Sequence, residues 1–351
     1  MTQGVSKPTS ATSVDVARRA GVSQSAVSLV LGGKANGRIG LKAQRAVRRA
    51  ARDLGYRPNV AAQILRSGQS RLLVLAVPDI DNPYFAGALK GAEHEARSQG
   101  YSVALATVRE GRDWQPVILD SLTSRSVDGF LLFALPPPTA REKRALRGRA
   151  ILVDASTQGF PSIVLGVEDG MRAALQHLHR AGHTEIGHLG AAVDIETFRL
   201  RRETYLSTLR AARLPVREAY QALAPFGIEA ATEAARKILS GSERPSAIVC
   251  DSDVLAVGVY KAAKALGLAI PNELSVVGID DSIIARILDP ELTTVAVPAG
   301  LIGQRAVRLL LDVLKGLDVP IRSTVPLSLV IRESTTTKSS QHAKTRAQGA
   351  K

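Results

Sequence analysis

Small polar side chains gather on one face of a short predicted helix near the start of the chain. Gln24, Ser25 and Ser28 belong to the segment QSAVSLVL (24–31) and are expected to point outward. The apolar residues of this segment recur at helical spacing on its other side: Val27, Val30 and Leu31. Amide and hydroxyl groups on an exposed helix can bind the edges of DNA bases, or they can simply be solvated. The choice depends on the elements that hold this helix.

Another helix and a tight corner precede this segment. Thr12 can cap a helix over 13–20, and Asp15 three residues later completes the capping pattern and favours the positive helix start. Gly21 allows the chain to turn, and Ser23 can cap the helix that follows. Two helices joined in this way form a helix-turn-helix unit, whose second helix can lie in the major groove of DNA.

A third helix is predicted over 41–54. Its apolar side chains recur at helical spacing: Ala43, Ala46, Val47, Ala50 and Leu54. Four arginines fall mostly outside that apolar stripe: Arg45, Arg48, Arg49 and Arg52. Three short helices of this size share one small core, so residues 12–57 are expected to be one helical domain. Residues 1–11 are polar and are expected to be disordered.

The positive charge of the chain is concentrated at its ends. The sequence has 46 Lys and Arg against 32 Asp and Glu, a formal net charge of +14. Residues 1–71 hold 13 of these basic residues and two acidic ones, and 338–351 add four basic residues. The region between them is nearly neutral. This distribution is typical of a protein whose N-terminal region binds a polyanion such as DNA.

Other classes of protein are disfavoured by features that the sequence lacks. The single cysteine, Cys250, excludes a disulfide framework and fits a reducing compartment. No signal peptide and no run of about 18 apolar residues is found, so we expect a cytoplasmic protein without membrane contact. A transport-type binding protein would need that signal peptide and would not explain the basic head.

Motifs of common enzymes and metal sites are also missing. The chain has no G-x-G-x-x-G after its first predicted strand, no P-loop and no G-x-S-x-G. The segment HLHRAGH (177–183) contains three histidines, but His177 and His179 are two residues apart and would not share a helix face. We predict no catalytic site, no bound metal and no cofactor.

Residues 58–70 are predicted to form a linker with a short helix. Pro58 suits the first position of a helix, and 59–65 would give about two turns before Gly68 breaks it. A helix this short is marginal in water and needs a partner or ligand to form. A plain linker is the alternative, but it would leave Leu65 exposed.

Residues 71–333 alternate between predicted strands and helices. The strands are apolar runs of the kind buried on both faces of a parallel sheet: 72–77, 101–107, 129–134, 150–154, 185–190, 246–250 and 274–279. Helix-length segments lie between them: 84–99, 169–181, 199–212, 229–240, 253–266 and 300–315. This repeat predicts doubly wound α/β architecture, and its length favours two sheets with a cleft between them. Residues 334–351 are expected to form a disordered basic tail.

Together these features resemble the lactose/galactose repressor (LacI/GalR) family of bacterial transcription regulators. Six motifs occur in the expected order between Thr12 and Glu333: DVARRAGVSQSAVS, LGYRPNVAAQILRSGQS, VPDIDNPYF, HLHRAGHTEIGHLG, DSDVLAVGVYKAAKALGLAIPNELSVVGIDD and LTTV. The resemblance implies an N-terminal all-α helix-turn-helix headpiece and a core like that of periplasmic binding proteins. In that core, two doubly wound parallel-sheet subdomains are crossed by three segments and hold an effector in their cleft.

By this resemblance the headpiece binds operator DNA. The implied DNA-binding residues are Thr12, Ser23, Gln24, Ser25, Ser28, Leu29, Tyr56, Asn59, Ala62 and Leu65. Gln24 and Ser25 fall on base-reading positions, and 59–65 matches a hinge helix that wedges Leu65 between base pairs in the minor groove. Leu29 departs from the family, where arginine is frequent. Because leucine offers only apolar contact, the operator should differ from the commonest family sites.

The resemblance also implies an effector site at the carboxyl ends of the strands. The implied effector-binding residues are Tyr84, Phe85, Arg201, Phe226, Ser252, Asp253 and Asp280. Aromatic faces can stack on a sugar or base ring, and Arg and Asp can bind hydroxyl or carboxylate groups. Ser252 replaces a frequent Asn, which removes an amide that contacts sugar hydroxyls. Plain structural interpretations remain open: Tyr84 and Phe85 could be core, and Asp253 could cap the next helix.

The sequence therefore predicts a homodimeric, sequence-specific transcriptional regulator. A repressor is favoured over other kinds of regulator. Its partners would be a pseudo-palindromic double-stranded operator and a small effector, expected to be a sugar or sugar derivative, that controls operator affinity allosterically. The tail lacks a leucine heptad, which favours a dimer over a tetramer. The alternative is a small-molecule sensor with only generic DNA affinity.

Overall fold

The computed structural model describes residues 11–33, 35–56, 68–108, 126–241 and 243–337. The chain divides into two compact units, Met1–Ser70 and Arg71–Lys351, at the position where the sequence predicts the end of the linker. The predicted hinge helix at 59–65 lies outside the described residues. So do residues 1–10 of the predicted disordered N-terminus and residues 338–351 of the predicted tail.

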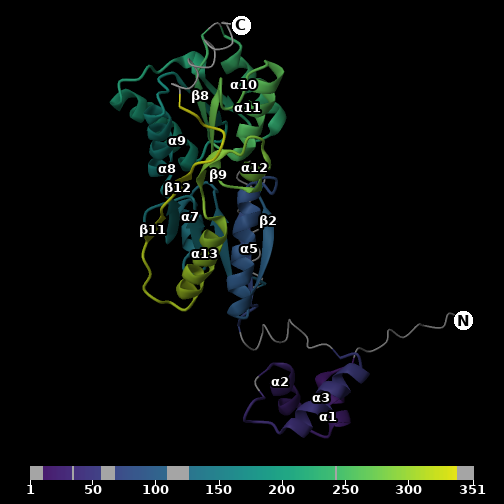
Figure 1. Ribbon diagram of the computed structural model, residues 1–351. Coiled ribbons are helices and arrows are strands. Elements are labelled where there is room, and N and C mark those ends of the chain that lie inside the picture. The colour runs from purple at the N-terminus through teal and green to yellow at the C-terminus, as the bar shows by residue number, and fades with distance from the viewer. Residues whose placement is uncertain (1–10, 34, 57–67, 109–125, 242, 338–351) are drawn as a thin grey trace, which may run out of the picture. The chain divides into compact units, whose positions relative to one another are not determined.

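The first unit is a headpiece whose described residues form three helices (Figure 1). Their bounds are α1 Ser13–Ala20, α2 Gln24–Leu31 and α3 Leu41–Asp53. Thr12 and Asp15 form the predicted capping box of α1, and the Ser23 hydroxyl caps α2. Each helix contributes an almost fully buried valine to a common core: Val16, Val27 and Val47. The predicted helix-turn-helix unit is therefore confirmed.

The second unit contains two sheets, each of six strands over the described residues. The first is parallel throughout, in the order β11-β5-β4-β3-β1-β2. Its strands are β1 Leu72–Val77, β2 Ser102–Thr107, β3 Gly129–Phe133, β4 Ala150–Val153, β5 Ser162–Leu165 and β11 Arg322–Val325. The second sheet has the order β12-β10-β9-β8-β6-β7, and only β12 is antiparallel to its neighbour. Its strands are β6 Ile186–Ala191, β7 Gln221–Ala224, β8 Ala247–Cys250, β9 Ser275–Asp280, β10 Thr293–Ala296 and β12 Ser328–Val330.

Helices alternate with these strands, and the chain crosses between the sheets three times. The helices are α5 Pro83–Ser98, α7 Ala140–Leu146, α8 Val167–Arg180, α9 Glu196–Ala211, α10 Ile228–Leu239, α11 Asp253–Ala265, α12 Ile283–Ile287 and α13 Ala299–Leu314, with a short 3-10 helix, η1 Glu218–Tyr220. The crossings follow β5, β10 and β11, so each sheet combines segments that are distant in sequence. The predicted architecture of two doubly wound parallel-sheet subdomains is confirmed.

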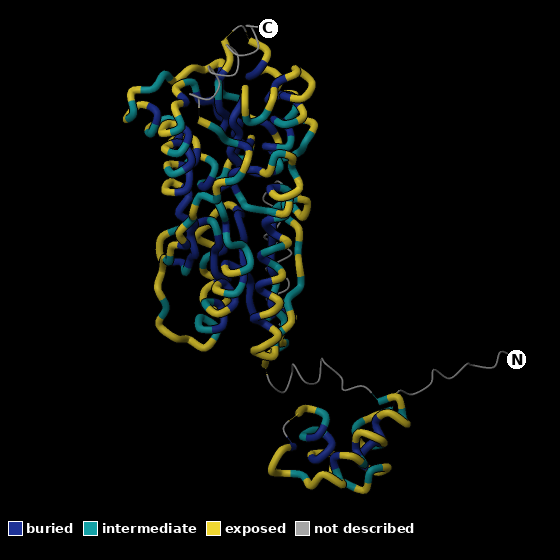
Figure 2. Tube along the Cα trace, in the orientation of Figure 1, coloured by how far each residue is buried: buried dark blue, intermediate teal, exposed yellow. Residues whose placement is uncertain are grey.

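Buried residues run through the middle of the core unit (Figure 2). Strands β3, β4 and β8 are buried along their whole length, as the apolar runs predict. Strand β5 is equally buried but was not among the predicted strands. Strand β2 differs from the prediction of burial on both faces. It is an edge strand, and Leu105 within it is 42% exposed.

The end of the core also differs from the prediction. A disordered tail was expected from residue 334, yet Ser334 is fully buried. Its hydroxyl donates to the Val276 carbonyl at 2.6 Å and accepts from the Thr293 N–H at 2.8 Å. The described core continues to residue 337. Composition missed this extension because hydrogen bonds from small polar residues, and not apolar burial, attach the segment.

Candidate ligand cavity and DNA-binding face

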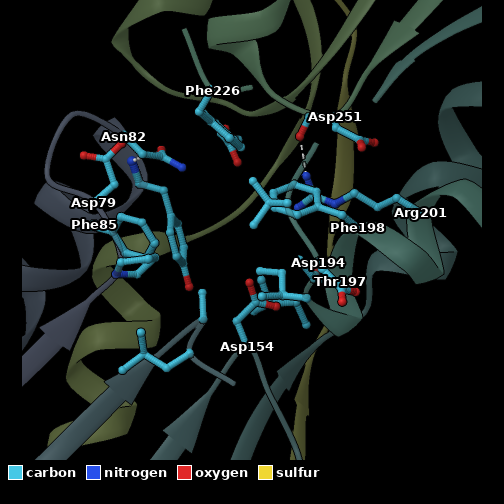
Figure 3. A pocket seen from close by; sticks show the side chains of 18 of the residues that line it. Asp79, Asn82, Phe85, Asp154, Asp194, Thr197, Phe198, Arg201, Phe226 and Asp251 are labelled. Atoms are coloured by element: carbon cyan, nitrogen blue, oxygen red, sulfur yellow. Dashed lines mark hydrogen bonds between the residues drawn. The ribbon is translucent and has the colours of Figure 1, made fainter. Parts of the chain in front are cut away.

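A cavity of about 600 Å³ opens at the carboxyl ends of strands from both sheets (Figure 3). Its lining includes the residues that directly follow six strands and the last residue of β9: Pro78, Ala134, Asp154, Ala192, Pro225, Asp251 and Asp280. Ligands of doubly wound folds bind at this edge, and the volume is typical of a small-molecule site. The cavity lies where the sequence predicts an effector.

The start of α5 forms one aromatic wall of the cavity. Asn82 caps this helix by accepting from the Tyr84 N–H at 3.0 Å, and the rings of Tyr84 and Phe85 then lie 5.1 Å apart. Both rings are more than nine-tenths buried and line the cavity, so they are core and lining at once. The buried Tyr84 Oη has no hydrogen-bond partner among the described residues. Burial, reinforced by the carboxyls of Asp154 and Asp280, raises the pKa of Tyr84, which keeps the phenol a neutral donor.

Arg201, on α9, faces the cavity from the other side (Figure 3). Its side chain is buried, Nη1 donates to the Asp251 carbonyl, and its guanidinium carbon lies 5.1 Å from the centroid of the Phe198 ring. Its Nε is buried and has no acceptor within the part of the chain that the structure describes. Arg199 and Arg202 are exposed. The structure therefore selects Arg201 from the three neighbouring arginines.

A second aromatic wall lies beside this arginine. The ring centroids of Phe198 and Phe226 are 5.7 Å apart, and both side chains are half-buried and line the cavity. Polar groups lie between this wall and the one formed by α5 (Figure 3). The arrangement suits a ligand that has both an apolar ring face and several hydrogen-bonding groups.

Two carboxyls of the cavity have raised pKa values. Burial raises the pKa of Asp154 to about 6, against the opposing effect of the Arg201 charge. Burial and the nearby charge of Asp253 raise the pKa of Asp280, whose carboxyl accepts from the Ser252 hydroxyl at 2.9 Å. Asp154 and Asp280 also have positive φ angles, 57° and 130°, of a kind that clusters at binding sites. Near neutral pH the pair can offer donors as well as acceptors.

Ser252 and Asp253 do not line the cavity. Ser252 caps α11 and reaches the cavity only through its bond to Asp280. The Asp253 carboxylate accepts from Thr294 Oγ1 at 2.6 Å, and from the Ser282 N–H and hydroxyl at 2.8 and 2.9 Å. These bonds use the carboxylate to hold the adjacent loop. Direct contact between Asp253 and a ligand stays a prediction.

Several polar and aromatic lining residues were absent from the predicted set: Asp79, Asn82, Asp154, Thr197, Phe198 and Asp251. Asp154 and Asp251 directly follow the apolar runs of β4 and β8. An aspartate at the end of a buried apolar strand also indicated Asp280, so the same pattern could have indicated Asp154 and Asp251. Thr197 and Phe198 lie in the first turn of α9, and no sequence pattern indicates which of its residues face the cavity.

The outer face of α2 holds the predicted base-reading side chains. Gln24 and Ser25 are exposed, whereas Ser28 and Leu29 are half-buried. The Gln24 Nε2 donates to Ser13 Oγ at 2.8 Å, which holds this amide beside the start of α1.

The other predicted DNA-binding residues lie around the headpiece or beyond it. Thr12 and Ser23 are exposed and serve as helix caps, and Tyr56 packs against the headpiece core. Asn59, Ala62 and Leu65 fall outside the described residues. The predicted wedge therefore stays a prediction.

Comparisons with known proteins agree with this division. The family profile "Bacterial regulatory proteins, lacI family" matches residues 13–59, and the profile "Periplasmic binding protein-like domain" matches residues 175–335. The HTH-type transcriptional repressor CytR of Escherichia coli (strain K12) is 30% identical over 332 residues, which are 93% of this chain and 97% of CytR. The chain belongs to the lacI family. Catabolite control protein A of Priestia megaterium is also 30% identical, over 84% of this chain and 90% of that protein.

Two solved structures of transcriptional regulators match over nearly the whole chain. The lac repressor dimer bound to operator and the anti-inducer ONPF is 26% identical with a TM-score of 0.82, covering 93% of this chain and 99% of that one. The complex of the transcriptional regulator CelR with cellobiose is 26% identical with a TM-score of 0.69, covering 92% and 99%.

This protein is therefore a DNA-binding transcriptional regulator of the repressor type with a core for an allosteric effector. No helix in the described part of the chain has both the length and the apolar character needed to span a membrane.

Proposed function

We propose that this protein is a homodimeric repressor whose affinity for a pseudo-palindromic operator is controlled by a sugar or sugar derivative bound in the cavity. The observation that carries this proposal is the pairing of unsatisfied donors with carboxyls inside one cavity. Tyr84 Oη and Arg201 Nε are buried without partners among the residues that the structure describes, and the carboxyls of Asp154 and Asp280 lie in the same cavity.

Hydroxyl groups fit this set because each can donate and accept at once. A polyhydroxylated ligand would accept from Tyr84 and Arg201 while donating to Asp154 and Asp280. Leaving such groups buried and unpaired costs roughly 1–3 kcal/mol each, so a ligand that pairs them gains that stabilisation on binding. The rings of Phe198 and the α5 wall would cover the apolar faces of a sugar ring.

The cavity supports allosteric control because strands of both sheets contribute to it. A ligand that draws the two edges together would bend the three crossing segments and change the angle between the subdomains. Such a change at the attachment of the headpieces would alter operator binding by a coupling of typically about 1–3 kcal/mol.

The dimer is supported by exposed apolar side chains of the second subdomain. Ile283 and Ile287, on α12, are 67% and 70% exposed, and Leu223 on β7 is 51% exposed. Large exposed apolar groups of this kind mark interaction surfaces. Two headpieces in a dimer match the two half-sites of a pseudo-palindrome.

Arg201→Ala tests the cavity directly. Isothermal titration of the purified protein with a panel of aldoses and disaccharides should identify a ligand whose affinity the substitution lowers at least tenfold. Arg202→Ala, an exposed neighbour on the same helix, should bind that ligand like the wild type. Operator affinity without ligand should be nearly unchanged in both variants. Equal affinity for the ligand in Arg201→Ala would remove Arg201 from the site.

A further inference from the structure

The outer face of α3 in the headpiece has a purely basic stripe. Its five members recur at intervals of three or four residues, with Arg48 and Arg49 adjacent, and all are exposed: Lys42, Arg45, Arg48, Arg49 and Arg52. The buried residues of the helix lie on the opposite side: Gln44, Val47, Ala50 and Ala51. The stripe is therefore not needed to pack the headpiece core.

In the described part of the headpiece, neither carboxylate is paired with the basic stripe. The acidic residues of its described part are Asp15 and Asp53. Asp15 pairs with Arg18 at 3.4 Å and accepts from the Thr12 N–H and hydroxyl, and Asp53 pairs with Arg19 at 3.6 Å. Both carboxylates thus interact with residues of α1 or with its cap. An ordinary solvated helix face mixes the two signs of charge.

Like charges one helical turn apart destabilise a helix. Arg45 and Arg49 are spaced i,i+4, as are Arg48 and Arg52, so the stripe repels itself. An anionic partner that lies along the helix removes this repulsion. From Lys42 to Arg52 the stripe extends about 15 Å along the helix axis, a length over which one strand of B-DNA presents about four phosphates.

A hollow at the end of α3 is a candidate binding site for one phosphate. It is lined by Leu31, Arg48, Ala51, Arg52, Gly55 and Tyr56. Two guanidinium groups one turn apart can each bind phosphate oxygens in the bidentate manner that a lysine cannot reproduce. Both guanidinium groups belong to the stripe, so the hollow and the stripe form one surface.

We propose that the basic stripe of α3 is a phosphate-binding surface for duplex DNA, additional to the base-reading face of α2. The proposal rests on DNA binding by the headpiece. The duplex is either the one that α2 reads or a second segment of DNA, because both present the same backbone. An acidic protein would fit the charge of the stripe but has no comparable spacing of anions, so DNA is the favoured partner.

The test is the salt dependence of binding between the full-length protein and a short duplex of random sequence. Replacing Arg45 and Arg49, or Arg48 and Arg52, by Gln should reduce the slope of log K against log [KCl] by about 1.8, since each lost phosphate contact removes about 0.9. The control replaces Arg141 and Arg144 on α7, two exposed arginines with the same spacing as Arg45 and Arg48, and should leave the slope unchanged. Stripe variants whose slope matches that of the control would overturn the proposal, and would leave an acidic protein as the candidate partner.

Lysine variants separate charge from folding. Arg48→Lys/Arg52→Lys should keep the wild-type slope but bind more weakly at every salt concentration, because the charge stays and the bidentate contacts are lost. A smaller slope of log K against log [KCl] in the lysine variant would contradict phosphate binding in the hollow. Failure of the wild type to bind DNA would contradict DNA binding itself, a separate outcome.

A second arm distinguishes the two sources of phosphate. Two duplexes, each long enough to occupy both headpieces of one dimer and carrying a donor or an acceptor dye, are mixed with the protein at low salt. Energy transfer with the wild type that disappears in the stripe variants identifies a second duplex. A stripe-dependent slope without energy transfer identifies contacts on the duplex that α2 reads.

Discussion

Asp154 is a cavity residue whose ionisation should oppose folding. Its folded-state pKa is about 6, above the ordinary value of 3.8, because burial disfavours the charged carboxylate. Between pH 4 and pH 6 the folded state therefore holds a proton that the unfolded state has released, and stability falls as the pH rises through this window.

Asp154→Asn should remove this pH dependence. At pH 7.5 its free energy of unfolding should exceed that of the wild type by roughly 1–2 kcal/mol, and the difference should vanish near pH 4, where the wild-type carboxyl is also largely neutral. Urea unfolding between pH 4 and 8 measures it. Asp194→Asn, at a 95% exposed lining residue, should change nothing. An Asp154→Asn variant less stable than the wild type at pH 7.5 would contradict the assignment.

The sequence indicated the cavity residues whose types are unusual at their positions. It did not indicate those that can be assigned to the cavity only when the direction of the side chain is known. Five of the predicted effector-binding residues line the cavity: Tyr84, Phe85, Arg201, Phe226 and Asp280. Asp253 does not, although it also follows a buried strand closely. Which of several consecutive polar residues turns toward a ligand is decided by loop hydrogen bonds, such as those of Asp253 with Thr294 and Ser282, and no residue spacing encodes them.

Helices α5 and α13 approach so closely that two glycines are required at their contact. A Cβ on Gly91 would lie 2.0 Å from the Gly300 carbonyl oxygen, and one on Gly303 would lie 2.0 Å from the Ala88 carbonyl oxygen. Helix α5 starts at the cavity and α13 follows a crossing segment. This contact therefore joins the aromatic wall of the cavity to the segments that cross between the subdomains.

Gly91→Ala should lower the free energy of unfolding by about 1–3 kcal/mol, because the helices must separate and lose packing. The gain in helix propensity, roughly 1 kcal/mol, is smaller than the steric cost. Gly300→Ala is the matched control on the facing helix, since its Cβ would meet nothing closer than 3.9 Å. Thermal unfolding compares the two. Equal stability in both variants would mean that the close approach is not maintained in solution.

At the level of elements, apolar runs predicted well and short polar strands did not. The predicted strands at 72–77 and 246–250 agree with β1 and β8 almost residue for residue. Strands β7, β10, β11 and β12 were missed, since QALA, TTVA, RSTV and SLV lack a long apolar run. Strand β5 was also missed, although three of its four residues, SIVL, are apolar. The place of β11, for example, is fixed by its pairing with β5, which is distant in sequence. A local pattern does not contain this information.

For the whole molecule, the proposed dimer makes one clear prediction. Ile287→Asp should shift the protein to monomers in analytical ultracentrifugation, because a charge on α12 would have to be buried in the interface. Operator affinity should fall with it, since a monomer presents only one headpiece. Ile331→Asp, at a similarly exposed isoleucine, should remain dimeric. A fully dimeric Ile287→Asp variant would move the interface elsewhere.

Coupling between the cavity and the headpiece is tested most directly by measuring operator affinity with and without a bound sugar. The operator is first located by footprinting the DNA next to the gene that encodes this protein, and its affinity is then measured against a saturating series of sugars. We predict a short palindrome bound in large excess over random DNA, and at least one sugar that changes this affinity about 5- to 150-fold. Equal binding to every fragment, unaffected by any sugar that binds the core, would contradict allosteric control and leave a sensor with generic DNA affinity.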